Sequence, residues 1–400
     1  MKLFNTLTKQ KEEFVPIDGN TVRIYSCGPT VYGSPHVGNL RAYIFVDILK
    51  KSLELDGYKI DDVMNTTDVG HLQSDADEGE DKIEVAARKQ KLDPQAIAEK
   101  YTKEFFNATD RLNIRRPKVV APASQYVGHI IDHVLVLEEK GYTYRTSDGV
   151  YFDSSRFEKY YELQGKKPGG DRAGARIEMG EKRNVNDFVL WRQTAPTALQ
   201  KWDSPWGIGA PGWHMECSAI ARAHLGDTFD IHTGGIDHIP VHHTNEIAQT
   251  EALTGCKMAN FWVHNQFITI DGGKMSKSLG NVYTLDDVIE RGFDPMSFRY
   301  LTFLTHYRSV LNFTWTGLES AQTAYRNLIK KLIKHKNGTN KIDVTKYREE
   351  FKGYISDDLN TAKTLALIWG LMKTEASSDI YNLVLEFDKV LSLSLKEATK

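Results

Sequence analysis

The stretch TVRIYSCGPTVYGSPHVGN, residues 21–39, contains the turn from a strand into a helix that decides the fold. Residues 21–27 are a β-favouring run that ends at a Gly-Pro pair. From residue 35 onward, apolar residues recur at helical spacing until Gly57. A second β-favouring run, YKIDDVMNTTDV, follows at residues 58–69. Strand, helix and strand in this order predict a βαβ unit and a parallel α/β sheet.

The composition is that of an ordinary globular protein, with 40% hydrophobic and 26% charged residues. A length of 400 residues predicts two or three domains. The formal net charge of −2 excludes a global attraction to nucleic acid, so an RNA partner needs local basic patches. No apolar run of about 18 residues appears, so we expect no membrane span. Three cysteines without disulfide-framework spacing, and no signal peptide, predict a reduced, cytoplasmic protein.

The rest of the chain predicts an insertion and a helical end. Residues 84–112 indicate two helices separated by a turn at Asp93-Pro94, and Asp148-Gly149 lies in a typical hairpin. A segment rich in glycine and charge follows at 164–187. From residue 313 onward the pattern is helical. Two apolar stripes are expected to face the core of this bundle: Ala321, Tyr325, Leu328 and Leu332, and Leu359, Ala362, Ala366 and Trp369.

Cysteine, histidine and glutamate residues in three distant segments suggest a metal site. Cys27 follows the first predicted strand, and Cys217 precedes the histidine-rich stretch DIHTGGIDHIPVHHTNEIAQ, residues 230–249. His242 and Glu246 are one helical turn apart, so both side chains can face one ion. These four residues would make a Zn²⁺ site. The alternative is that both cysteines are small buried hydrophobic residues, and the spacing alone does not decide between the two.

Two further segments have the chemistry of phosphate binding. In HVGN, residues 36–39, a helix start offers backbone N–H groups, Gly38 permits close approach and His36 is a donor. In DGGKMSKSLGN, residues 271–281, two glycines and two lysines form a loop that can bring ammonium groups onto a polyphosphate. Each segment alone is also compatible with an ordinary helix start or an exposed loop. The combination of the two favours nucleotide binding.

HVGN together with KMSKS on a βαβ opening resembles the signature motifs of class I aminoacyl-tRNA synthetases. The segments GWHMECS (212–218) and HHTNEIAQ (242–249) make the chain similar to the cysteinyl-tRNA synthetases within that class. The resemblance covers about residues 1 to 395. It implies a ligase that forms cysteinyl-adenylate from L-cysteine and Mg·ATP, releases pyrophosphate, and transfers the cysteine to the 3′ end of tRNA-Cys.

The resemblance also implies residue roles. A zinc ion at Cys27, Cys217, His242 and Glu246 would bind the substrate thiol, which a serine hydroxyl replaces poorly. The catalytic residues would be His36, Asn39, Lys274 and Lys277. ATP would be bound by these residues together with Gly38, Gly234, Gly235, Asp237 and Ser278. The amino-acid pocket would be formed by Thr67 and Trp213, and the surrounding histidines, some of them orienting ligands or substrate, are His71, His214, His232 and His243.

The expected architecture is a Rossmann-type parallel nucleotide-binding domain with an inserted connective segment, followed by an α-helical bundle. Its parts are the first half of the catalytic domain (1–115), the insertion (116–202), the second half (203–270), the lysine loop with a stem-contact region (271–312) and the bundle (313–400). The family usually continues into an anticodon-binding module, and this sequence ends where that module would begin. A monomer is expected.

Two other functions compete with this interpretation. A ligase built on the same catalytic half passes cysteine to an aminosugar, as in mycothiol biosynthesis, and differs from the synthetase in its acceptor. A non-catalytic paralogue that binds RNA would have degenerate motifs, whereas His36, Lys274, Lys277 and the four metal-ligand candidates are all present. A zinc-stabilised structural protein would not need the lysine loop. The sequence therefore favours the synthetase.

Overall fold

A parallel sheet of five strands is the centre of the computed structural model, which describes residues 1–72, 79–165, 180–276 and 279–399. The strand order is β11-β10-β3-β4-β5, and every neighbouring pair is parallel. The predicted βαβ unit is confirmed as β3, α1 and β4. The five strands are β3 (Thr21–Ser26), β4 (Lys59–Thr66), β5 (Val119–Pro122), β10 (Phe229–Gly235) and β11 (Ala259–Asn265).

Helices α1 (Val37–Leu55) and α5 (Trp213–Leu225) cover opposite faces of this sheet. The alternation along β3 shows why: Ile24 packs in the cluster of α1, whereas the next residue, Tyr25, packs in the cluster of α5. Both side chains are fully buried. A strand with an apolar environment on each face reads as a continuous β-favouring run, which is the pattern that residues 21–27 show.

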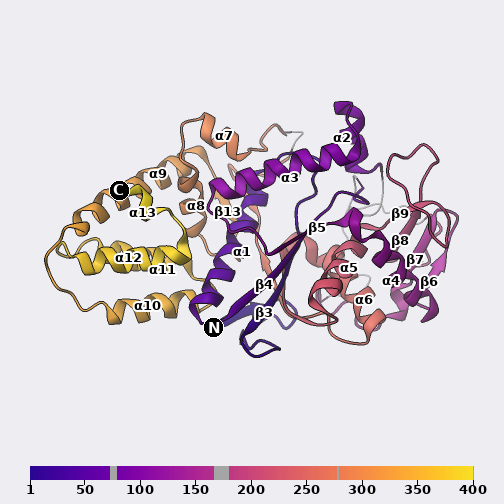
Figure 1. The fold of residues 1–400 in the computed structure, drawn as a ribbon, viewed down its shortest axis with the longest axis horizontal. Helices are drawn as coiled ribbons and strands as arrows, with labels where there is room; N and C mark the ends of the chain where they lie inside the picture. The colour runs from indigo at the N-terminus through magenta and orange to yellow at the C-terminus, as the bar shows by residue number, and fades with distance from the viewer. Residues whose placement is uncertain (73–78, 166–179, 277–278, 400) are drawn as a thin grey trace.

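Further helices surround the sheet (Figure 1). The predicted turn between two helices is confirmed, because Asp93 caps α3 by accepting a hydrogen bond from the backbone N–H of Ala96 at 2.8 Å. These helices are α2 (Lys82–Gln90), α3 (Pro94–Arg111), α4 (Val127–Glu139) and α6 (Thr244–Thr254). Short helical turns are η1 (Ala123–Tyr126), η2 (Ser154–Arg156), η3 (Ile236–His238) and the π-helical η4 (Ile239–His243).

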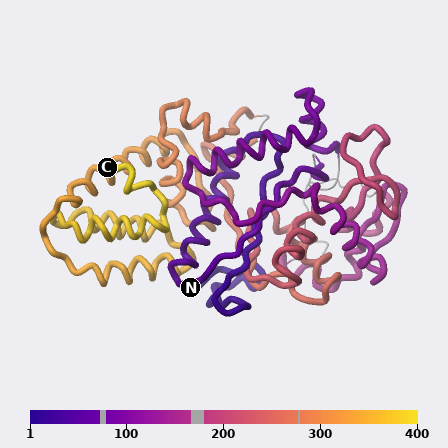
Figure 2. Tube along the Cα trace, viewed as in Figure 1, coloured from indigo at the N-terminus to yellow at the C-terminus, as the bar shows by residue number. Residues whose placement is uncertain are grey.

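A second, antiparallel sheet with the order β6-β7-β8-β9 lies at one end of the molecule, opposite the helical bundle (Figures 1 and 2). The predicted hairpin around Asp148-Gly149 is confirmed as β6 and β7. The four strands are β6 (Thr143–Arg145), β7 (Gly149–Phe152), β8 (Phe188–Gln193) and β9 (Gly209–Pro211). The domain limits at 116 and 202 stay a prediction. β5 follows the first limit and belongs to the parallel sheet, and β9 follows the second and belongs to this one.

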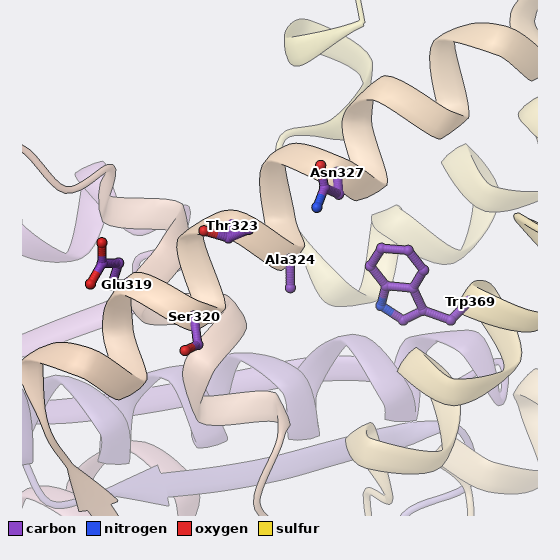
Figure 3. Close-up of a pocket in the computed structure, with 6 residues that line it drawn as sticks. All are labelled: Glu319, Ser320, Thr323, Ala324, Asn327 and Trp369. Atoms are coloured by element: carbon purple, nitrogen blue, oxygen red, sulfur yellow. The ribbon is translucent and has the colours of Figure 1, made fainter.

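The C-terminal part is helical, as predicted. The stripe Ala321, Tyr325, Leu328 and Leu332 is buried. The second expected stripe is confirmed only in part: Leu359 is buried and Trp369 packs against the core cluster, but Ala366 is exposed. Helix α11 buries Thr364, Leu365 and Ile368 instead. A groove beside Trp369 runs between α9 and α11 (Figure 3). The helices are α7 (Leu285–Glu290), α8 (Pro295–Phe303), α9 (Trp315–Lys336), α10 (Thr345–Ile355), α11 (Thr361–Leu371), α12 (Ser378–Leu391) and α13 (Leu395–Ala398).

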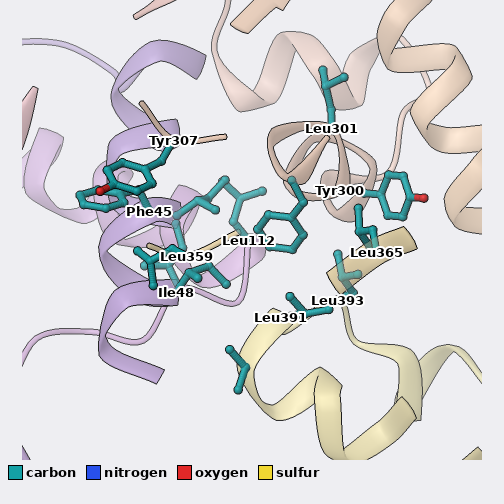
Figure 4. Packing of buried hydrophobic residues seen from close by; sticks show 14 of the residues in the cluster. Phe45, Ile48, Leu112, Tyr300, Leu301, Tyr307, Leu359, Leu365, Leu391 and Leu393 are labelled. Atoms are coloured by element: carbon teal, nitrogen blue, oxygen red, sulfur yellow. The ribbon is translucent and has the colours of Figure 1, made fainter. Parts of the chain in front are cut away.

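One apolar cluster joins helix α1 to the bundle (Figure 4). Phe45 stacks on Tyr307 with ring centroids 4.6 Å apart, and Leu391 and Leu393 pack in the same cluster. Two short strand pairs complete the fold: antiparallel β1 (Lys2–Asn5) with β2 (Gln10–Glu13), and parallel β12 (Ile268–Ile270) with β13 (Leu311–Phe313). In the described part of the chain no helix is long and apolar enough to cross a membrane.

Candidate active site

The candidate site lies at the carboxyl ends of β3 and β10. From β3 the chain continues to β4 and β5 on one side, and β10 and β11 lie on the other side, so the order of the strands reverses next to β3. Ligands of open α/β sheets bind where the strand order reverses, outside the carboxyl ends of the strands. Cys27 follows β3 directly, and Gly234 and Gly235 end β10. The predicted strand-to-helix junction is therefore at the edge of the sheet where binding is expected.

The four residues predicted to hold a metal are brought together. The ligand atoms of Cys27, Cys217, His242 and Glu246 all lie within 4.8 Å of one another. The two Sγ atoms are 4.0 Å apart, and Cys217 Sγ lies 3.5 Å from His242 Nε2. His242 Nε2 and Glu246 Oε1 are 3.0 Å apart. Three distant segments thus converge on one point: the end of β3, helix α5, and the η4–α6 turn.

These distances fit a tetrahedral site. Two thiolates on one zinc at about 2.3 Å each lie roughly 3.8 Å apart, which is close to the separation of Cys27 and Cys217. Two sulfurs, an imidazole nitrogen and a carboxylate oxygen are also a donor set that favours zinc. The four residues therefore form a group that could hold a metal. A second overlapping group, which shares Cys27 and Glu246, includes His232 and His243.

The charges of the cluster suit a cation. Burial alone would raise the pKa of the Cys27 thiol, but hydrogen bonding from Cys217 and nearby imidazoles hold it well below its usual range. Burial and the Cys27 thiolate raise the pKa of Cys217. Although burial opposes both shifts, the Glu246 carboxylate raises the pKa of His242 to about 10, and His232 and His242 lower the pKa of Glu246 to about 2.

Neighbouring histidines orient the ligand candidates. His214 Nδ1 lies 2.9 Å from Nδ1 of His242, and His232 Nε2 lies 2.8 Å from Oε2 of Glu246. With these contacts in place, the remaining atoms point at the thiols: Nε2 of His242 faces Cys217, and Oε1 of Glu246 faces Cys27. Such outer contacts fix the tautomer and the ring orientation of a ligand. Among the histidines left open by the sequence, His214 and His232 are thus the ones that contact the ligand candidates His242 and Glu246.

Trp213 lies directly beside the cluster. Its indole stacks on His242 with ring centroids 4.1 Å apart, and on His71 at the same separation. The Thr67 hydroxyl lies nearby in the fold and donates to Glu216 Oε1 at 2.5 Å. Burial raises the pKa of Glu216 well above its usual range. The amino-acid pocket assigned to Thr67 and Trp213 stays a prediction.

The predicted phosphate-binding residues lie at the start of α1. His36 is the N-cap of the helix, and its Nδ1 accepts from the backbone N–H of Asn39 at 3.1 Å. The Asn39 side chain accepts in turn from the backbone N–H of His36 at 3.2 Å. The two side chains thereby form a capping box around the positive end of the helix. This leaves the other ring nitrogen of His36, Nε2, outside the capping box.

The lysine loop lies against the same helix start. A Cβ on Gly38 would be 3.5 Å from Met275 Cε, and the backbone N–H of Val37 donates to Tyr283 O at 2.8 Å. Lys274 is exposed. Lys277 and Ser278 lie outside the described residues, so their predicted contacts with ATP are not placed. The two segments predicted to bind phosphates, the helix start and the lysine loop, are therefore adjacent.

The adenosine contacts predicted for Gly234, Gly235 and Asp237 stay untested predictions. Gly234 packs against imidazoles, since a Cβ there would come within 2.6 Å of His243 Cε1. Asp237 folds back over Gly235, with Oδ1 2.2 Å from where a Cβ would lie. A side chain at either position would therefore collide with the site. The sequence predicted that these two glycines leave room for the nucleotide. In the structure, the atoms close to them belong to protein side chains.

Sequence reasoning missed His264. It is the penultimate residue of β11, and its Nε2 lies 2.7 Å from His243 Nδ1. The other ring nitrogen of His243 lies 3.2 Å from Cys27 Sγ. His264 Nδ1 is 2.8 Å from the Thr6 hydroxyl. The signal was available: a histidine at the carboxyl end of a predicted parallel strand lies at the edge of the sheet where the site forms.

The fold is that of a class I aminoacyl-tRNA synthetase. Methionyl-tRNA synthetase of Mycobacterium tuberculosis with methionyl-adenylate has a TM-score of 0.63 at 12% identity, covering 95% of this chain and 90% of that one. LeuRS of Agrobacterium radiobacter K84 in a ternary complex has a TM-score of 0.67 at 12% identity, covering 97% and 85%. At such low identity the likeness shows the fold alone.

Sequence comparison gives the family. Residues 13–323 match the tRNA synthetases class I (C) catalytic domain. Cysteine–tRNA ligase of Treponema denticola is 43% identical over 426 aligned positions, covering 99% of this chain and 87% of that protein. Cysteine–tRNA ligase 1 of Burkholderia lata is 43% identical and covers 99% and 85%. The chain belongs to this cysteine-specific family of class I tRNA synthetases, which confirms the resemblance.

Proposed function

We propose that this chain activates L-cysteine with ATP and transfers it to the 3′ end of tRNA-Cys. The single observation that carries the proposal is the convergence of Cys27, Cys217, His242 and Glu246 beside the helix start that bears His36. The full-length similarity to cysteine–tRNA ligases supports the same activity. An amino-acid site with two thiols and a nucleotide site share the carboxyl edge of one sheet.

The metal that suits the cluster is zinc. Cys27, Cys217, His242 and Glu246 would hold it. When bound, the ion supplies a Lewis-acid site that prefers a thiolate over a hydroxyl, which selects cysteine against serine. Trp213 stacks on His242 and would close the pocket on one side, so the substrate's short side chain lies between an indole and the cluster. Specificity based on the thiol makes a separate editing step unnecessary.

The helix start and the lysine loop would serve the first step. A carboxylate oxygen of cysteine attacks the α-phosphorus of Mg·ATP, and the bond from that phosphorus to the pyrophosphate oxygen breaks. His36 and the N-terminal N–H groups of α1 bind phosphate oxygens. Lys274 and Lys277 stabilise the charge that develops on the leaving pyrophosphate, while Asn39, Gly38 and Ser278 line the nucleotide. These roles are argued from residue chemistry and from the adjacency of the two segments.

In the second step, a ribose hydroxyl at the 3′ end of the tRNA attacks the carbonyl carbon of the adenylate, and AMP leaves. The bundle offers a surface for the rest of the RNA. Lys330, Lys331 and Lys334 are exposed on α9. The same helix carries Asn327, which together with Trp369 lines a groove of ≈ 520 Å³ (Figure 3). Phosphates bind ammonium groups, and an indole face can stack on an unpaired base. The monomeric state and the cytoplasmic location stay predictions.

The acceptor decides between the synthetase and the aminosugar ligase. Purified protein, ATP and labelled cysteine are incubated with tRNA-Cys or with an inositol-linked glucosamine. We expect acid-precipitable label on the tRNA only. Label on the aminosugar alone would contradict the proposal and favour the competing ligase. The absence of any cysteinyl product, together with binding of RNA, would favour the non-catalytic paralogue.

A further inference from the structure

Arg41 is a buried arginine that the mechanism above does not use. It lies on α1, two residues after Asn39, and only 3% of its surface is exposed. In the described part of the chain its guanidinium is bonded by carbonyl oxygens rather than by a carboxylate. Burial therefore lowers its pKa to about 10 with no opposing partner. A buried cation held in this way is costly, so its position in the fold calls for an explanation.

The four terminal N–H groups of Arg41 reach two separate segments. Nη1 donates to Gln266 O at 3.0 Å and to Phe267 O at 2.7 Å. Nη2 donates to His306 O at 3.2 Å and to Ser309 O at 2.7 Å. The planar fork of a guanidinium matches this fixed arrangement, whereas a lysine ammonium has three donors on one atom.

Both segments support the strand pair from which the lysine loop starts. Residues 266 and 267 lead into β12, and residues 306 to 309 lead into β13, its parallel partner. The loop starts directly after β12, where Asp271 N donates to Phe313 O at 3.0 Å and Gly272 N to Asn312 Oδ1 at 2.8 Å. Arg41 thus joins α1 to the two strands that carry the start of the loop.

The far end of the loop is also tied to α1. Val37 N donates to Tyr283 O at 2.8 Å, and His36 forms an isolated bridge with Thr284. The helix start and the lysine loop, the two segments proposed to bind phosphates, are therefore connected at both ends of the loop. The tie at Tyr283 is formed by backbone groups. Among these contacts, Arg41 supplies the side-chain tie at the β12–β13 root.

We propose that Arg41 is a positioning residue that sets the distance between the HVGN helix start and the lysine loop for adenylate formation. The inference rests on the proposed function. In the described part of the chain, the hydrogen bonds of Arg41 go to backbone carbonyl groups and not to the four metal-ligand candidates, so it acts through the carbonyl groups that it holds. In-line attack at phosphorus needs both phosphate-binding segments at the correct distance from each other. A small shift of the loop therefore lowers kcat. Binding of cysteine depends on the other side of the site and is unaffected.

Arg41→Lys is the test, because it keeps the charge but loses the fork. In cysteine-dependent ATP–pyrophosphate exchange, we expect kcat to fall by about 10- to 100-fold. KM for cysteine should stay within about twofold of the wild-type value, since the thiol pocket is intact. Arg41→Gln, which keeps two N–H donors without the charge, is measured in parallel. If one of the two variants does not fold, the other still tests the proposal. Assays are run at a temperature where circular dichroism shows every protein folded.

Arg299→Lys is the matched control. Arg299 is also fully buried and donates to two carbonyl oxygens, Leu112 O and Leu391 O. Unlike Arg41, it also pairs with the Asp47 carboxylate, and it lies at the contact of α1 with the bundle rather than at the lysine loop. We expect a comparable loss of melting temperature with kcat unchanged within about twofold. If kcat falls equally in both variants, or is unchanged in the Arg41 variants, the inference is wrong. If wild-type protein shows no exchange at all, the proposed function fails instead.

Discussion

Cys217 decides at the residue scale whether the thiol cluster holds a metal. The buried Cys217 Sγ faces Cys27 Sγ at 4.0 Å. Cys217→Ala removes one of four donors, and we expect zinc affinity to fall by at least about 100-fold, because ligand loss exceeds the effect of losing an outer contact. Metal per chain is measured after dialysis against a competing chelator. Cys256→Ala, at an exposed cysteine outside the cluster, is the control, and equal metal retention by both variants would contradict the prediction.

His214 is predicted to matter without being a ligand. Its Nδ1 lies 2.9 Å from His242 Nδ1 and fixes the ring that faces the thiols. His214→Phe keeps the ring and removes the contact, so we expect zinc affinity to fall about 10- to 100-fold while the protein stays folded. Competition with a chromogenic chelator gives the affinity. An unchanged affinity would show that His242 is oriented by packing against Trp213 alone.

His133 predicts how stability depends on pH. Burial, together with the charge of Arg222, lowers its pKa to about 4, well below the ordinary value. His133 is therefore protonated near pH 6.5 in the unfolded chain but stays neutral at that pH in the folded protein. The contribution to stability is complete above pH 6.5, is lost as the pH falls to about 4, and amounts to ~3 kcal/mol. In urea unfolding at pH 7, 5.5 and 4.5, His133→Gln should lose less stability than wild type, and parallel losses would contradict this.

At the scale of elements, Asp47 and Arg299 join helices α1, α8 and α12. Asp47 Oδ2 accepts from Arg299 Nη2 at 2.5 Å and from Lys51 Nζ at 2.7 Å, and both Asp47 and Arg299 are fully buried. Asp47→Ala leaves an unpaired buried guanidinium, so we expect a loss of about 3–5 kcal/mol in the free energy of unfolding. The double variant Asp47→Leu/Arg299→Met should recover most of it. A double variant as unstable as the single one would contradict this account of the pair.

The elements themselves were largely predictable from the sequence. The strand, helix and strand of residues 21–69 and the turn at Asp93 follow from local periodicity and capping, and these predictions are confirmed. On α11 the predicted stripe is right at Trp369, which packs against the core cluster, and wrong at Ala366, which is exposed. Alanines such as Ala366 are small enough for either side of a helix, so the spacing of Ala362 and Ala366 did not distinguish them.

Within the site, the metal-ligand candidates could be predicted because cysteine, histidine and glutamate are rare enough in combination to be noticed. The contacts of Arg41 could not be predicted. Its partners are backbone carbonyls of residues 225 to 268 positions away, and every residue has a carbonyl. The packing of Gly234 against His243 was missed for a related reason, since it depends on how η4 turns back toward β10.

At the scale of the whole molecule, the lysines of α9 are predicted to bind the tRNA backbone. Lys330→Glu/Lys334→Glu should raise KM for tRNA-Cys and reduce the slope of log affinity against log salt by about 1–2, with pyrophosphate exchange unchanged. The matched control is Lys341→Glu/Lys346→Glu. Those lysines are paired with Asp379 at 3.6 Å and Glu350 at 3.8 Å, so they contribute little free charge. Equal effects of the two double variants would contradict a specific role of this face.

The central claim is that a metal held by the thiol cluster selects cysteine for activation. The most direct measurement is ATP–pyrophosphate exchange with cysteine or serine, before and after removal of zinc by chelation and after zinc is restored. We predict exchange with cysteine only, loss on chelation, and recovery with zinc. Exchange that survives chelation and accepts serine would contradict the claim and leave Cys27 as a packed thiol. Folded, zinc-loaded protein with no exchange would contradict the catalytic function itself.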